Sequence, residues 1–147
     1  MRALFDVNVL LAVLQPDHAH HEHAQQWWAA NRAGGWASCP ISQNGFVRII
    51  SQPRYPKPMA LAVAVGVVAD LIEGTDHNFW PDDISLLDAQ HVDPTRILGP
   101  KQLTDIYLLA LAVKNGGRFV TFDRAIPVGA VRGATDKHIV VIEGAEA

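Results

Sequence analysis

The stretch Arg2-Ala-Leu-Phe-Asp-Val-Asn-Val-Leu-Leu-Ala-Val-Leu14 decides how the rest of the chain is interpreted. Residues 2–5 predict a short strand, and residues 7–14 carry enough apolar side chains to predict a buried helix that ends before Pro16. Asp6 therefore falls at a turn from strand to helix. In open α/β sheets, ligands bind at the carboxyl ends of the strands, so Asp6 is a candidate site residue.

The same alternation of short apolar strands and helices continues along the chain. Further strands are predicted at 36–39, 118–122 and 139–142, with an extended piece at 77–81, and further helices at 19–32, 42–50, 59–73 and 105–114. Ser42 and Thr104 are the predicted N-caps of two of these helices. This order predicts an α/β fold with a central parallel sheet flanked by helices on both faces.

Length and charge limit the classes of protein that the chain can belong to. With 147 residues, of which 49% are hydrophobic, it fits one compact domain with a substantial core. The formal net charge of -3 argues against a strongly basic protein that holds nucleic acid through its overall electric field. Any contact with RNA would have to be local and assisted by a metal ion.

Cysteine content and hydropathy predict the compartment. The single Cys39 excludes an internal disulfide framework and fits a reducing environment. The N-terminus lacks the long apolar stretch of a signal peptide, and the most apolar windows, 59–72 and 106–113, are shorter than a membrane span. We expect a cytoplasmic protein that makes no contact with a membrane.

Asp123 and Asp105 are the acids that we expect to join Asp6. Asp123 follows a predicted strand, and Asp105 lies in the first turn of a helix, where the helix dipole helps to keep it ionised. Clustered carboxylates repel one another unless a cation such as Mg²⁺ or Mn²⁺ relieves the repulsion. Ordinary turns and helix starts also favour Asp, so the residues alone leave both readings open.

Sequence motifs favour a metal site over ordinary turn and helix-start residues. The segments LFDVNVL (4–10), TDIYLLALA (104–112) and TFDR (121–124) resemble the PIN-domain ribonucleases, specifically the VapC toxins of bacterial toxin-antitoxin pairs, in order and spacing. Shorter segments resemble a subgroup of that family, so that the similarity covers nearly the whole chain; they are 36–40, 44–48 and 79–83.

The resemblance implies a structure and an activity. It implies one PIN domain over residues 1–147, acting as the toxin of a type II toxin-antitoxin module, a divalent-metal-dependent endoribonuclease that cleaves RNA phosphodiesters. It further implies that Asp6, Asp105 and Asp123 bind Mg²⁺ or Mn²⁺, while Asn8 and Thr121 support the site. The implied protein partner is a small cognate antitoxin of the VapB type whose tail occupies the active-site groove, and we also expect a homodimer.

One position departs from the family pattern. Gln43 stands two residues before Gly45, where the family commonly has a glutamate. A neutral amide is a poorer metal ligand than a carboxylate, so we predict that one cation is held well and a second weakly, with Gln43 outside the ligand set. The alternative is a catalytically weakened PIN-fold module that binds antitoxin or RNA, although the intact aspartates count against it.

Further residues outside the aspartate cluster could bind a ligand or pack in the core. The histidines between His18 and His23 lack the spacing of a catalytic zinc site and are interpreted as exposed residues at a helix start. The proline-rich loop with Arg54, Tyr55 and Lys57 is either an RNA-contacting patch or a solvated loop. Tryptophans 27, 28 and 36 are predicted to pack in the core or an interface, and Arg48 and Arg124 to contact phosphate or an antitoxin carboxylate.

Overall fold

The computed structural model describes residues 1–143, in which five parallel strands form one sheet. Their spatial order is β3-β2-β1-β4-β5, and each pair of neighbours runs in parallel. The strands are β1 (Ala3–Phe5), β2 (Trp36–Ser38), β3 (His77–Phe79), β4 (Arg118–Thr121) and β5 (Ile139–Val141). The predicted parallel sheet is confirmed, with β1 at its centre.

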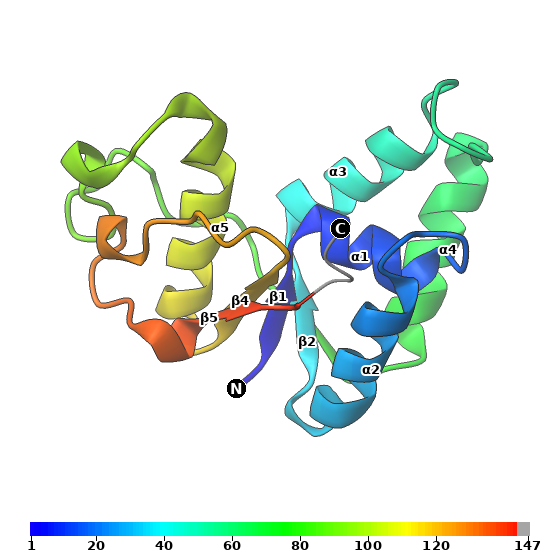
Figure 1. Ribbon diagram of the computed structural model, residues 1–147, viewed down its shortest axis with the longest axis horizontal. Helices are drawn as coiled ribbons and strands as arrows, with labels where there is room; N and C mark the ends of the chain where they lie inside the picture. The colour runs from blue at the N-terminus through cyan, green and yellow to red at the C-terminus, as the bar shows by residue number, and fades with distance from the viewer. Residues whose placement is uncertain (144–147) are drawn as a thin grey trace.

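Helices cover both faces of this sheet, as the sequence predicted. They are α1 (Val7–Leu14), α2 (His21–Asn31), α3 (Pro40–Ile50), α4 (Leu61–Glu73) and α5 (Leu103–Lys114). Figure 1 shows α5 on one side and α1 to α4 on the other. On that second side α1 packs against α2 and α3, and α3 packs against α4.

Alternating side chains of each central strand enter different hydrophobic cores. Phe5 and Val120 point into the core under α1 to α4, whereas Leu4 and Phe119 point into the core under α5. All four are almost completely buried. This burial on both faces explains why the strands are continuously apolar instead of alternating with polar residues.

Aromatic packing fixes the first of these cores. The Phe5 ring stacks on Trp36 with centroids 5.5 Å apart and meets Trp28 edge to face at 5.8 Å. Trp27 approaches the same ring at 6.2 Å. The prediction that these tryptophans pack in the core is confirmed.

Both predicted N-caps are wrong by a few residues. Helix α3 begins at Pro40 with Cys39 as its N-cap, and the Ser42 hydroxyl accepts a hydrogen bond from the Cys39 amide at 3.0 Å. Proline is favoured at the first helical position because its fixed φ suits the helix and its missing amide hydrogen is not needed there. Helix α5 begins at Leu103, directly after a 3₁₀ turn, so Thr104 is already helical.

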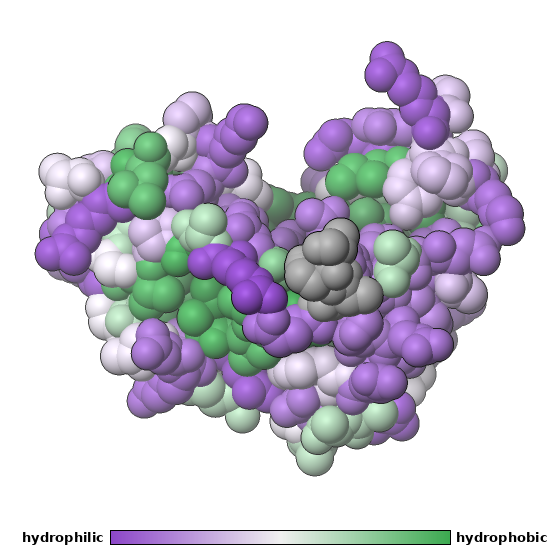
Figure 2. Space-filling model, viewed as in Figure 1, coloured by the Kyte–Doolittle hydropathy of each residue, from purple (hydrophilic) through white to green (hydrophobic). Residues whose placement is uncertain are grey.

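The carboxyl ends of the strands face a gap between α5 and the helices of the opposite side (Figure 1). Figure 2 shows the surface hollowed between two raised lobes at this edge. In the described part of the chain, no helix has both the length and the apolar character needed to cross a membrane. The last four residues of the predicted domain, 144–147, lie outside the described residues.

Two glycines offer a test of how tightly the sheet is packed. A Cβ on Gly117 would lie 2.5 Å from the Arg2 carbonyl oxygen and 2.6 Å from the Trp80 ring, whereas a Cβ on Gly66 in α4 would have nothing within 4 Å. We expect Gly117→Ala to lower the free energy of unfolding by about 1–3 kcal/mol through overpacking. Gly66→Ala should raise it by about 0.5–1 kcal/mol, because alanine favours the helix. Urea denaturation of both variants measures this, and equal effects would contradict the packing described here.

Candidate active site

The Thr121 hydroxyl connects two of the predicted site residues. It donates a hydrogen bond of 2.8 Å to Asp6 Oδ2 and accepts one of 3.1 Å from the Asp123 backbone amide. Thr121 is the last residue of β4, and Asp6 directly follows the neighbouring strand β1. The parallel register therefore brings together residues that are 115 positions apart in sequence.

Asp6 is a buried carboxylate at the N-terminus of α1, and only 9% of its surface is exposed. Burial raises its pKa above the ordinary value, and the charge of Asp123 acts in the same direction. The hydrogen bond from Thr121 opposes this rise, as do the backbone amides of Asn8 and Val7, although Asp6 forms no regular N-cap bond. The ionised form of Asp6 therefore depends on its neighbours.

Asp105 faces the same negative charges from the first turn of α5. Its pKa is raised to about 6, first by burial and then by the charges of Asp6 and Asp123. The helix dipole was expected to help to keep Asp105 ionised, but burial and repulsion raise its pKa despite its place in the first turn of the helix. The expected repulsion among the three carboxylates is present.

Repulsion among the three aspartates does not by itself make them a metal-binding site. Within residues 1–143, no three His, Cys, Asp or Glu side chains are grouped so that they could hold a metal ion together. The three aspartates nevertheless supply the oxygen donors that a hard cation prefers, and they carry repulsion that such a cation would relieve. The donor chemistry fits Mg²⁺ or Mn²⁺, and ligation would require the carboxylates to draw closer.

The remaining predicted site residues differ in where they lie. Asn8 is exposed on α1, and it reaches Asp6 through its backbone amide. The Gln43 side chain, on α3, donates a hydrogen bond of 2.9 Å to Ser38 Oγ, which also lies 2.7 Å from His77 Nε2. The role of Gln43 at the metal site stays a prediction.

Sequence reasoning did not single out Ser38 and His77. Ser38 ends β2 and is only 1% exposed, so a buried hydroxyl at a strand end was the available signal. His77 begins β3, and its pKa is lowered by burial and by the charge of Arg2. Ser38, which also contacts His77, therefore holds the side-chain amide of Gln43 near the carboxyl end of β2.

Two other groups near this edge are engaged in local contacts. The His20 ring packs on Phe122 with centroids 4.9 Å apart, so our interpretation of the histidine-rich segment as exposed and idle is wrong for this residue. Arg124 forms an ion pair with Glu143 in which both side chains are largely exposed. Such a pair is weak, so Arg124 can exchange it for another anion at little cost.

Comparison with known proteins identifies what this arrangement resembles. The PIN domain family model matches residues 3–130. Ribonuclease VapC44 of Mycobacterium tuberculosis is 53% identical over 97% of this chain and 100% of its own length. Ribonuclease VapC39 of the same species is 39% identical over 92% of this chain and 99% of its own length.

A solved structure shares the fold. It is described as VapBC2 from Rickettsia felis bound to a DNA fragment from their promoter. The TM-score is 0.56 at 10% sequence identity, over 86% of this chain and 94% of the other. This similarity supports the fold alone.

The raised pKa of Asp105 predicts that ionisation of its carboxyl group destabilises the folded chain. The folded state loses stability from this group as the pH rises from 3.8 through about 6, because ionisation is harder in the folded chain than in the unfolded one. In EDTA at neutral pH, Asp105→Asn should therefore melt at a higher temperature than the wild type, and the gain should shrink as the pH falls towards 3.8. The exposed Asp136→Asn is the control, and a lower melting temperature for Asp105→Asn would contradict the coupling.

Proposed function

Because the chain belongs to the PIN-domain family, and within it to the VapC ribonucleases, we propose that it is the toxin of a type II toxin-antitoxin module and cleaves RNA phosphodiester bonds. The observation that carries this proposal is the electrostatic coupling of Asp105 to Asp6 and Asp123 at one edge of the sheet. The VapC relatives that support the proposal match nearly the whole chain.

We propose Asp6, Asp105 and Asp123 as the ligands of Mg²⁺ or Mn²⁺. The bound cation would polarise the phosphodiester and lower the pKa of an attacking water. Thr121 holds one oxygen of Asp6 in place, and the Ala125 amide donates a 2.8 Å hydrogen bond to Asp123 Oδ1. These bonds orient the two carboxylates before substrate arrives, which reduces the reorganisation that the reaction requires.

A protein partner is part of the proposal. We propose a VapB-type antitoxin that binds this chain and inhibits it. Helix α4 exposes Leu61, Val63 and Val65, each more than half exposed, which supports a protein contact on that helix. Homodimer formation, a cytoplasmic location and a single domain over residues 1–147 remain our predictions.

Gln43 supports a second candidate function. Position 43 carries a neutral amide where the family commonly has a glutamate, and this amide bonds to Ser38, as expected of a member that binds antitoxin or RNA but cleaves weakly. The three aspartates favour the enzyme, because a pure binding module has no need to retain mutually repelling acids, of which Asp6 is buried and Asp105 half-buried.

The enzymatic proposal predicts dependence on metal and on Asp6. EDTA should abolish RNA cleavage by the antitoxin-free protein, and Mn²⁺ or Mg²⁺ should restore it. Asp6→Asn should lower the cleavage rate by at least about 100-fold, as expected when one ligand of a catalytic cation is lost. The readouts are RNA end-mapping in vitro and growth arrest at equal expression level.

Asp136→Asn, which changes an exposed acid outside this edge, is the matched control and should cleave normally. A wild type that binds no divalent ion, or an Asp6→Asn variant that arrests growth as well as the wild type, would leave only the binding module.

Gln43→Glu tests whether position 43 belongs to the site. A carboxylate there should tighten binding of a second cation and increase cleavage at low metal concentration. Calorimetric titration with Mn²⁺ measures the number and affinity of sites, and Gln43→Ala separates the effect of charge from loss of the Ser38 bond. If Gln43→Glu changes neither affinity nor cleavage rate, position 43 lies outside the site.

A further inference from the structure

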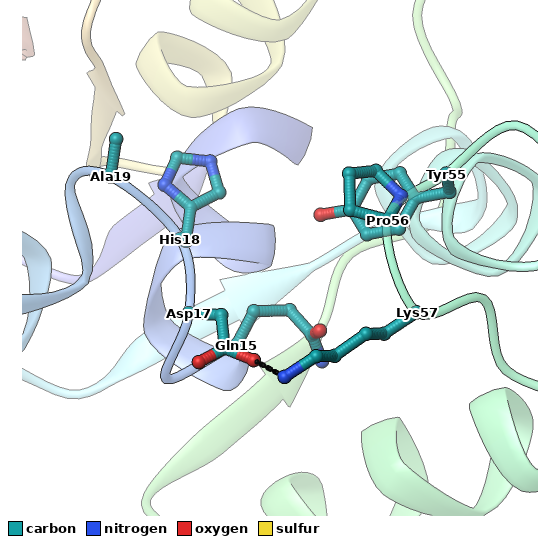
Figure 3. A pocket seen from close by; sticks show the side chains of 7 residues that line it. All are labelled: Gln15, Asp17, His18, Ala19, Tyr55, Pro56 and Lys57. Carbon is teal, nitrogen blue, oxygen red and sulfur yellow. Dashed lines mark hydrogen bonds and ion pairs between the residues drawn. The ribbon is translucent and has the colours of Figure 1, made fainter.

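A pocket lies beside the candidate active site, between the α1–α2 connection and the loop that joins α3 to α4. Its volume is about 500 Å³, which is within the range of small-molecule sites. Figure 3 shows the His18 ring on one side of the opening and Tyr55 with Pro56 on the other. Gln15 and the Asp17–Lys57 pair lie along its base in this view.

Phe122 connects this pocket to the carboxylates. The His18 ring is nearly parallel to the Phe122 ring, with an interplanar angle of 17° and centroids 6.5 Å apart. Phe122 stands between Thr121 and Asp123 in the chain, and Thr121 holds Asp6. A chain of RNA whose phosphate lies at the aspartates could therefore place a neighbouring nucleotide at His18.

The charges in the pocket favour a neutral ligand. Lys57 Nζ lies 2.7 Å from Asp17 Oδ2, so the cation of the pocket is neutralised by an anion of the same pocket. Burial lowers the pKa of His18, and the charges of His20 and His21 lower it further, which favours an uncharged ring. A phosphate or a charged peptide tail would find no uncompensated positive charge in the Asp17–Lys57 pair.

The loop that supplies Tyr55 has an unusual backbone. Lys57 has φ of 55°, and it is the one non-glycine residue with positive φ in the part of the chain that the structure describes. This conformation is costly for a residue with a Cβ and persists where surrounding contacts hold it. The ion pair between the exposed side chains of Lys57 and Asp17 joins this loop to the α1–α2 connection, and Tyr55 and Pro56 face His18 across the opening (Figure 3).

We propose that this pocket binds one base of the RNA substrate, stacked on the His18 and Tyr55 rings, and so contributes to the choice of cleavage site. The inference rests on the proposed function for its substrate class. Flat aromatic rings bind any nucleobase through its π-face, and the amide of Gln15, which also lines the pocket, can hydrogen-bond to the edge of a nucleobase. This occupant matches the neutral, aromatic lining better than a phosphate does.

Binding of mononucleotides tests the pocket without cleavage. Chemical shifts of the His18 and Tyr55 ring protons are followed by NMR during titration with AMP, CMP, GMP and UMP, and with ribose 5-phosphate, which has no base. At least one nucleotide should shift both rings, and ribose 5-phosphate should not. No response to any nucleotide, or an equal response to ribose 5-phosphate, would overturn the proposal.

Cleavage kinetics test the role of the pocket in the reaction. His18→Ala and Tyr55→Ala should each raise KM for a short RNA spanning the mapped cleavage site by about 5- to 100-fold, the range expected for loss of one base stack, while kcat changes little. Tyr55→Phe and His18→Phe, which keep a flat ring, should recover most of the affinity. His23→Ala, in the same histidine-rich segment but outside this pocket, is the matched control.

An abasic substitution identifies the base concerned. Removing one base near the cleavage site should raise KM for the wild type, and should raise it less in Tyr55→Ala, which retains only the His18 ring. Unchanged KM in both alanine variants, or a loss of antitoxin binding without a loss of RNA binding, would overturn the proposal and assign the pocket to the protein partner or to neither. Nucleotide binding without any RNA cleavage would instead refute the proposed function and leave the pocket standing.

Discussion

The hydrogen bond from Thr121 to the buried carboxylate of Asp6 is the contact on which the candidate site depends. It exists because β1 and β4 are parallel neighbours at the middle of the sheet, so their carboxyl ends lie side by side. The same hydroxyl also accepts the Asp123 amide, which sets the direction in which the chain leaves β4. One buried hydroxyl thus determines the positions of two acids, and the apolar cores on both faces keep the two strands in register.

Holding three carboxylates at one edge works against the stability of the fold. Desolvation raises the pKa of Asp6, and desolvation with repulsion raises that of Asp105 to about 6. A sequence under no constraint except stability would replace Asp6 and Asp105 with neutral residues, because burial penalises the charge of both. The strain is understandable if a divalent ion binds between them, since the same repulsion that disfavours the metal-free state is relieved on binding.

Most of the fold could be predicted from the sequence, because strands buried on both faces are recognisable as short apolar runs between helices. Asp6 and Asp123 could be assigned to one edge for the same reason, whereas Asp105 required the resemblance to a family. The caps of α3 and α5 were missed because proline, or a 3₁₀ turn, starts each helix before the residue that propensity favours. Repulsion among the carboxylates could be predicted, but its effect on Asp105 in particular could not, because burial, the main cause of the raised pKa, depends on packing by residues distant in sequence.

The contacts around Gln43 and His20 could not be predicted, because His77, which contacts the Ser38 partner of Gln43, and Phe122, which contacts His20, are distant in sequence. The partner of Gln43 at the end of β2 has its own contact with His77 from β3, so this small network depends on the strand order. His20 packs on Phe122, about a hundred positions away, once β4 lies beside β1. A histidine in an isolated helix start gives no sign of such a neighbour.

The electrostatic balance of the chain also determines how it can hold RNA. With a net charge of -3, the protein as a whole repels a polyanion, so affinity must come from short-range contacts instead of a general positive field. A cation among the aspartates would attract a single phosphate, and stacking would add affinity that does not depend on charge. A protein built this way gains little from non-specific electrostatic binding, and its choice among RNAs therefore depends on the few nucleotides that reach the hollow at the carboxyl edge of the sheet.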